Sequence, residues 1–124
     1  MKTALVIEDN ENNMALITFI LHANGFETLR AERGIQGIEI FAENDPDFIL
    51  LDIQLPDIDG AEVLSRIRET EKGATIPIIA VTSYAMVGDK CALIEAGCDG
   101  YIEKPIDPFH FIAEINSIVN FAPA

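Results

Sequence analysis

The sequence predicts an α/β fold in which a five-stranded parallel sheet carries helices on both faces. Short apolar runs, typical of buried strands, alternate with segments whose apolar residues recur every three or four positions, as in amphipathic helices. This strand–helix alternation occurs five times along the chain. It favours a parallel sheet, because each helix carries the chain back to the edge where the next strand begins.

Five segments are expected to form the strands. Residues 4–7 (ALVI), 48–52 (FILLD) and 78–82 (IIAVT) are almost wholly apolar, which predicts strands buried on both faces. Residues 26–31 (FETLRA) alternate roughly between apolar and polar side chains, which predicts a more exposed strand. Residues 100–103 (GYIE) predict a short last strand.

Helices are expected over residues 11–24, 34–43, from the turn at 56–60 to about Glu69, over 86–96, and from Pro108 onward. Gly25 and Gly97 are the stop signals of the first and fourth helices. Gly37 weakens the second by about 1 kcal/mol relative to Ala. The residues expected to face the core are Asn13, Leu16, Ile17, Ile20 and Leu21, then Ile35, Ile38 and Phe41, then Val63, Leu64 and Ile67, and finally Phe111, Ile112, Ile115, Ile118 and Val119.

Composition limits the classes of protein to consider. The 124 residues suffice for one domain, 49% of them are hydrophobic, and no apolar run is long enough to span a membrane. The first residues do not form a signal peptide, so we expect a cytoplasmic protein with no membrane insertion. The net charge of −13 makes direct nucleic-acid binding improbable. Cys91 and Cys98 are expected to be small buried thiols, and His110 to pack between its phenylalanine neighbours.

Polar residues follow four of the predicted strands. Glu8 and Asp9 end the first, Asp52 the third and Thr82 the fourth, while Lys104 follows the fifth. Each of them alone would be an ordinary cap, turn or surface residue. The carboxyl ends of parallel strands meet at one edge, so these residues should converge there. Crowded carboxylates repel one another, and Mg²⁺ would relieve that repulsion. A carboxylate, a metal, an ammonium group and a hydroxyl together favour phosphoryl transfer through an aspartyl phosphate.

Four motifs carry a resemblance to a known family. They are VIEDNENNM (6–14), ILLDIQLPDIDG (49–60), PIIAVTSYA (77–85) and GCDGYIEKPI (97–106). Together they resemble the receiver domain of two-component response regulators, the CheY-like superfamily, over essentially the whole chain. EDNENNM and SYAMVGD carry a narrower likeness to stand-alone, single-domain regulators of the cell-cycle type and to receivers attached to hybrid kinases.

The resemblance implies a role for each site residue. Asp52 would be the phosphoacceptor, and Thr82 and Lys104 would bind the phosphoryl group. Mg²⁺, or Mn²⁺ as a substitute, would be held by Glu8, Asp9, Asp52 and the backbone carbonyl of Gln54. Thr82 and Tyr101 would form the switch, and the Lys104–Pro105 peptide bond would be cis. Gln54 and Tyr84 stand at positions that vary among receivers, and Asp57 stands where Gly is frequent, which should alter the loop more than the chemistry.

The resemblance also implies the architecture and the partners. The fold would be flavodoxin-like, (βα)5 with strand order 2-1-3-4-5, and residues 1–124 would form a single receiver domain. The protein would be a binding switch rather than a turnover enzyme. A sensor histidine kinase or histidine phosphotransferase would donate the phosphoryl group. A downstream effector would recognise the surface of the fourth helix, the fifth strand and the fifth helix.

Three alternatives compete with this interpretation. The chain could be a receiver fragment of a larger response regulator or hybrid histidine kinase. A metal-dependent phosphatase of the haloacid-dehalogenase type would need a second Asp two residues after the nucleophile, and Gln54 and Glu11 stand at the two such positions. A flavin-binding module would need a Ser-, Thr- and Gly-rich loop after the first strand, where this chain has acidic residues.

Overall fold

The computed structural model describes residues 2–83 and 94–119. The elements are β1 (Thr3–Ile7), α1 (Glu11–Ala23), β2 (Glu27–Ala31), α2 (Gly34–Glu43), β3 (Phe48–Asp52), α3 (Gly60–Arg68), β4 (Ile78–Thr82), β5 (Gly100–Glu103) and α5 (Phe111–Ile118). Every strand predicted from the sequence is present. The helix predicted over residues 86–96 lies mostly outside the described residues, and its last three, 94–96, are helical.

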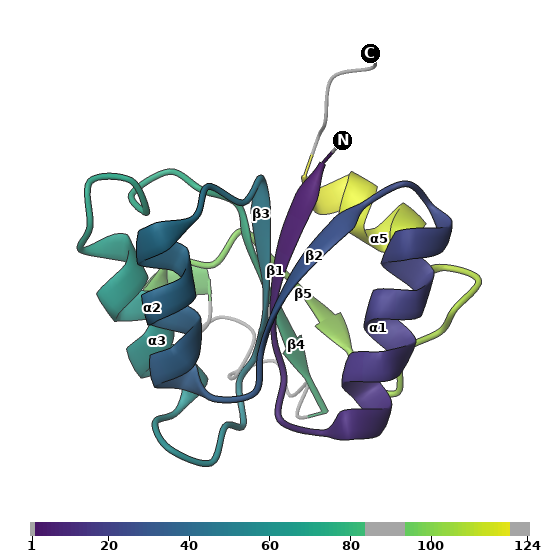
Figure 1. The fold of residues 1–124 in the computed structure, drawn as a ribbon, viewed down its shortest axis with the longest axis horizontal. Coiled ribbons are helices and arrows are strands. Elements are labelled where there is room, and N and C mark those ends of the chain that lie inside the picture. The colour runs from purple at the N-terminus through teal and green to yellow at the C-terminus, as the bar shows by residue number, and fades with distance from the viewer. Residues whose placement is uncertain (1, 84–93, 120–124) are drawn as a thin grey trace.

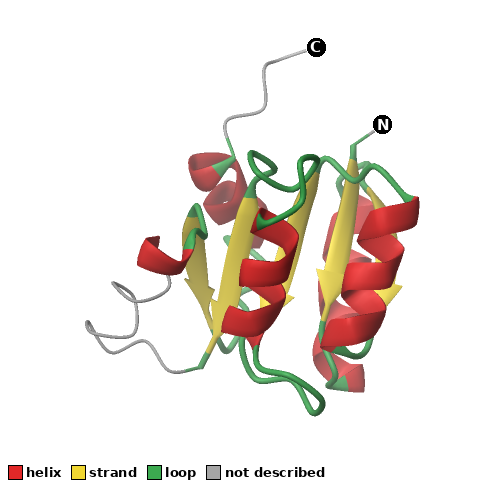
Figure 2. Ribbon diagram, turned by 90° about the vertical axis from the view of Figure 1, so that its left-hand side faces the viewer, coloured by secondary structure: helices red, strands yellow, loops and turns green. Residues whose placement is uncertain are grey.

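The five strands form one sheet in the order β2-β1-β3-β4-β5, and every neighbouring pair is parallel. The arrowheads in Figure 2 accordingly point toward the same edge. This confirms both the predicted fold class and the predicted strand order. Ile7 pairs with Leu51 and Asp52 pairs with Val81, so the carboxyl ends of β1, β3 and β4 lie nearly level.

Two apolar cores lie on opposite faces of the sheet (Figure 1). Successive strand residues point to opposite faces, so Leu5 belongs to one core and Val6 to the other. Helices α1 and α5 cover the core of Val6, and α2 and α3 cover the core of Leu5. Cys98 is buried in the second core, as predicted, whereas Cys91 lies outside the described residues.

Helix α1 begins at a side-chain cap and ends at a glycine. The Asn10 carboxamide accepts a hydrogen bond from the Asn13 amide at 3.0 Å, and Gly25 adopts φ +84°, the left-handed conformation that glycine tolerates best. The buried face includes the predicted Ile17, together with Thr18, whose hydroxyl donates within the helix. Within the described residues, no helix has both the length and the apolar character needed to cross a membrane.

Helix α2 packs through glycines rather than through the first isoleucine of the predicted stripe. Ile35 is 40% exposed, so its predicted core position is wrong, whereas Phe41 is buried. A Cβ atom added to Gly37 would lie 2.8 Å from Ile7 Cγ1, too close for a real contact. Gly37 therefore lets the helix backbone approach β1 closely, and this packing sets which side of the helix faces the core.

Helix α5 begins three residues later than Pro108, at Phe111. The Phe111 amide bonds the Asp107 carbonyl at 2.9 Å, so residues 108–110 form a turn before the helix. The prediction that His110 packs is wrong. Its side chain is 71% exposed, and Nδ1 lies 2.6 Å from an Asp107 carboxylate oxygen.

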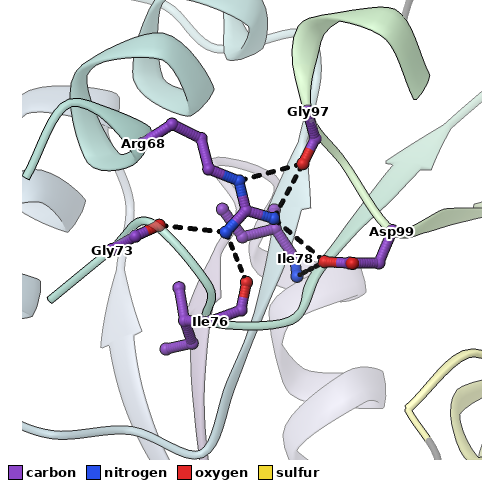
Figure 3. Close-up of polar contacts among 6 residues, drawn as sticks. All are labelled: Arg68, Gly73, Ile76, Ile78, Gly97 and Asp99. Carbon is purple, nitrogen blue, oxygen red and sulfur yellow. Dashed lines mark hydrogen bonds and ion pairs between the residues drawn. The ribbon is translucent and has the colours of Figure 1, made fainter. Parts of the chain in front are cut away.

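A cluster of hydrogen bonds around Arg68 ties together the opposite edge of the sheet, where β4 and β5 begin (Figure 3). The guanidinium group donates to the carbonyls of Gly97 (2.7 and 2.9 Å), Gly73 (2.9 Å) and Ile76 (2.6 Å), and to the Asp99 carboxylate (2.9 Å). Three backbone carbonyls from two loops therefore share one largely buried cation, which joins the end of α3 to the starts of β4 and β5.

Candidate functional site

The candidate site lies at the carboxyl ends of the strands, above β1 and β3. These two strands are neighbours in the sheet, but the chain continues from β1 to β2 on one side and reaches β3 on the other. Ligands of doubly wound sheets bind at such a reversal of strand order. A cavity of about 720 Å³ opens there, lined by Glu8, Asp9, Asn10, Glu11, Asn12, Asn13, Asp52, Gln54 and Lys104.

Three carboxylates meet in this cavity. One oxygen each from Glu8, Asp9 and Asp52 lies within 4.8 Å of the others. Glu8 is 1% exposed and Asp52 is 3% exposed, whereas Asp9 is exposed. The sequence-based prediction that these three acids converge is therefore met by the geometry.

Lys104 supplies the positive charge opposite the acids. Its Nζ atom lies 2.9 Å from Glu8 Oε1 and 3.3 Å from Asp52 Oδ2. Burial opposes its charged form, but the hydrogen bond that Lys104 donates to Glu8 and the charges of Asp52 and Glu8 outweigh this and raise the Lys104 pKa. The peptide bond that follows, Lys104–Pro105, is cis, the geometry implied by the resemblance.

The groups around Asp52 shift its pKa in opposite directions. Burial, together with a hydrogen bond and the charge of Glu8, raises its pKa to about 7, although the Gln54 amide and Lys104 act to lower it. The Gln54 amide donates to Asp52 Oδ1 at 3.0 Å, so this oxygen is held by the loop and Oδ2 faces the lysine. One lysine therefore does not neutralise the two buried acids.

A divalent cation fits this arrangement. Glu8 Oε1 is buried and, within the described residues, has no hydrogen-bond donor in addition to its ion pair with Lys104. Hard cations such as Mg²⁺ prefer carboxylate oxygens, and a second positive charge would relieve the repulsion that raises the Asp52 pKa. Glu8, Asp9 and Asp52 are the residues that could hold it.

The two predicted switch residues lie on the neighbouring strands β4 and β5. Thr82, at the end of β4, is 2% exposed, and its backbone carbonyl accepts the Lys104 amide at 2.8 Å. Tyr101, on β5, is half-buried and packs against the core that α2 and α3 cover. Tyr84, also singled out from the sequence, lies outside the described residues.

Two residues near the site have contacts that the sequence did not reveal. The Asn10 amide donates to Glu8 Oε2 at 3.3 Å, so the start of α1 contacts the acid cluster. The Asp57 carboxylate accepts hydrogen bonds from the amides of Gly34 and Ile35, both at 2.9 Å. Asn10 carries a local signal, a capping residue before a helix, but nothing local connects Asp57 with α2.

The fold and this acidic pocket define a receiver of two-component signalling. The protein-family model described as the response regulator receiver domain matches residues 4–116, and the chain belongs to this family. Receiver domains bind Mg²⁺ at an acidic pocket, and Glu8, Asp9 and Asp52 fit that pocket. They act in general with histidine kinases or phosphotransfer proteins and with effectors.

Among curated proteins, the chain is similar to a single-domain regulator. It is 41% identical over 121 residues to the polar-differentiation response regulator DivK of Brucella ovis, with 98% of each chain covered. The DivK of Brucella anthropi is 40% identical over the same length, again with 98% of each chain covered. This confirms the likeness to stand-alone regulators of the cell-cycle type.

Solved structures agree with this assignment. A putative response regulator from Chloroflexus aurantiacus superposes with a TM-score of 0.90 at 28% identity, covering 97% of this chain and 98% of its own. The receiver domain of a sensor histidine kinase from Pseudomonas aeruginosa, solved with a magnesium ion in its active site cleft, gives 0.88 at 30% identity, with the same coverage. The chemotaxis response regulator CheY4 of Vibrio cholerae, 20% identical with a TM-score of 0.91 over 95% of this chain and 98% of its own, shares the fold.

Proposed function

We propose that this protein is a phosphorylation-controlled switch in which Asp52 accepts a phosphoryl group from a phosphohistidine. The observation that carries the proposal is a buried aspartate that faces an open acidic cavity and has a lysine 3.3 Å from its Oδ2 atom. The donor would be a sensor histidine kinase or a histidine phosphotransferase. In the transfer, a carboxylate oxygen of Asp52 forms a bond to phosphorus while the phosphorus–nitrogen bond breaks, and the released imidazole nitrogen takes up a proton.

The site residues would have different roles in this transfer. Glu8, Asp9, Asp52 and the backbone carbonyl of Gln54 would hold Mg²⁺, with Mn²⁺ as a substitute; the ion neutralises charge on the acids and on the phosphoryl group. Lys104 is already within ion-pair distance of Asp52, so a small movement of its ammonium would bring it to a phosphoryl oxygen. The Gln54 amide holds Asp52 Oδ1 and orients the carboxylate.

The phosphoryl group would then change a binding surface. It adds acceptor oxygens and negative charge next to β4, where the Thr82 hydroxyl can be drawn toward it. Tyr101, half-buried on the adjacent strand, would move into the space that Thr82 vacates. The surface formed by residues 94–96, β5 and α5 would thereby differ between the two states, and an effector would bind one of them better. The rest of the predicted fourth helix lies outside the described residues. In this proposal residues 1–124 act as one receiver, a binding switch rather than a turnover enzyme.

The chemistry can be tested by intact-mass spectrometry with Mg²⁺ and acetyl phosphate as the donor. Wild-type protein should gain one phosphoryl group, and the Asp52→Asn variant should gain none. Labelling of both proteins to the same extent would show that Asp52 is not the acceptor.

The relay can be tested with the Thr82→Ala variant. We expect it to accept the phosphate mimic beryllofluoride while the NMR shifts of Tyr101 change much less than in wild type, because the hydroxyl that responds to the mimic is missing. Shift changes at Tyr101 as large as those of wild type would rule out the threonine as the relay.

A further inference from the structure

Asp57 joins the loop that follows the phosphoacceptor to a helix far away in the sequence. Its Oδ1 atom accepts the Gly34 amide and its Oδ2 atom accepts the Ile35 amide, each at 2.9 Å. These amides open α2, and within the described residues the helix's own N-cap, Arg33, makes no side-chain capping bond. Asp57 therefore caps α2 from another segment, and its negative charge lies at the positive end of the helix.

Apolar packing reinforces this connection. A Cβ atom added to Gly34 would lie 2.7 Å from Val63 Cγ2 and 2.8 Å from Ile58 Cγ1. The start of α2 is thus in close contact with both the loop and α3, and only a glycine leaves room for that approach. Hydrogen bonds from the Ile35 and Gly34 amides also lower the pKa of Asp57 to about 2, so the carboxylate stays ionised at neutral pH.

The same loop shapes the candidate site. It runs from Ile53 to Gly60 and is closed at its base by a 2.9 Å hydrogen bond from the Gly60 amide to the Ile53 carbonyl. At its beginning, the Gln54 amide holds Asp52 Oδ1. Three residues further along, Asp57 fixes the loop to α2. The loop is therefore attached at two points, to Asp52 through the Gln54 amide and to α2 through Asp57.

We infer that Asp57 is a positioning residue for the cation site: by capping α2, it holds the loop so that the Gln54 backbone faces Asp52 and the bound cation. This inference rests on the proposed function, because it assumes that Mg²⁺ binds beside Asp52. It also predicts a reciprocal effect. Cation binding that tightens the loop is transmitted through Asp57 to the first amides of α2.

The test is a Mg²⁺ titration followed by two-dimensional NMR of the Gln54, Gly34 and Ile35 amides. In wild type, all three amides should shift with one common midpoint. In Asp57→Ala, we expect the dissociation constant to rise about three- to tenfold, somewhat less than the roughly 10–100-fold typical of outer-shell partners that touch a metal ligand. The Gly34 and Ile35 amides should no longer follow the titration.

Two controls separate positioning from charge and from stability. Asp59→Asn removes one charge from the same loop but keeps an Asn cap on α3, where Asp59 Oδ1 accepts the Glu62 amide at 2.9 Å. Asp47→Ala removes a comparable tertiary bond, 2.7 Å from the Thr3 amide, where β1 and β3 begin rather than end. Both controls should bind Mg²⁺ within twofold of wild type. If Asp57→Ala does not fold, Asp57→Asn, which keeps one acceptor oxygen, provides the measurement instead.

The outcomes are distinguishable. A dissociation constant for the Asp57 variant within twofold of wild type, or an equal weakening in either control, would overturn the positioning role and leave the proposed function standing. If wild type itself shows no saturable response at Gln54, the cation site fails, and the inference fails with it.

Discussion

Replacing Asp52 by Asn should stabilise the protein when no divalent cation is present. The wild-type carboxyl is 3% exposed and lies beside Glu8, and burial first and Glu8 second raise its pKa from 3.8 to about 7. Asn has nearly the same shape, carries no charge, can still accept the Gln54 amide and can donate to Glu8. The variant therefore loses the repulsion without leaving a buried polar group unpaired.

The effect should depend on pH in a defined direction. A carboxyl whose pKa is higher in the folded than in the unfolded protein binds its proton more tightly when folded. Its contribution to stability is complete below about pH 4 and is lost as pH rises through about 7. The carboxamide of the variant does not titrate, so the variant lacks this loss. The difference in the free energy of unfolding between the variant and wild type should be clearly smaller at pH 5 than at pH 8. At pH 8 this difference should be near its full size.

The magnitude follows from the pKa. One pKa unit corresponds to about 1.4 kcal/mol, so a rise from 3.8 to about 7 sets an upper limit of roughly 4 kcal/mol. Asp52 titrates inside a cluster of interacting charges, so we expect about half of this, roughly 2 kcal/mol. For a chain of this size, such a gain raises the melting temperature by roughly 6–10 °C.

Thermal melts in EDTA at pH 5 and pH 8 measure this effect. Asp45→Asn is the matched control, since it removes one charge from a side chain that is 90% exposed. Adding Mg²⁺ at pH 8 should reduce the difference in melting temperature between the variant and wild type, because the ion stabilises the protein that binds it more tightly, the wild type. A variant that is less stable than wild type at pH 8, or a gain of equal size at both pH values, would refute the reasoning.

Three further predictions concern other positions. Asp9→Ala should weaken Mg²⁺ binding at least tenfold without lowering the metal-free melting temperature, since it removes one of three crowded carboxylates; a large loss of metal-free stability would mean that Asp9 is mainly structural. Arg68→Ala should lower the free energy of unfolding, measured in urea, by about 2–4 kcal/mol, because the backbone carbonyls that Arg68 binds lose their donor. A loss below about 1 kcal/mol would contradict this. Gly37→Ala should lower the free energy of unfolding by about 1–3 kcal/mol, because its new methyl group would overlap Ile7. A variant that is more stable than wild type would contradict this packing argument.

The positions of the site residues could be predicted from the sequence because they depend on chain order. Glu8, Asp9 and Asp52 end apolar runs, and parallel strands bring such ends to one edge. The order of the strands followed from the resemblance of the motifs and is confirmed by the sheet. Helical periodicity alone did not predict correctly which individual side chains face the core. Ile35 fits the helical stripe but is exposed, because the glycines of α2, not its first isoleucine, approach the sheet.

The sequence by itself determined the fold class, the order of the elements and the convergence of acids and lysine, because apolar periodicity and the polar ends of strands are local properties of the chain. Only the tertiary structure decided that Asp57 caps α2 and that Arg68 binds carbonyls of two loops. These contacts join a side chain to backbone groups that lie between 5 and 29 residues away. A backbone amide or carbonyl is the same in every residue except proline, so no residue type marks such a partner, and folding alone brings the two groups together.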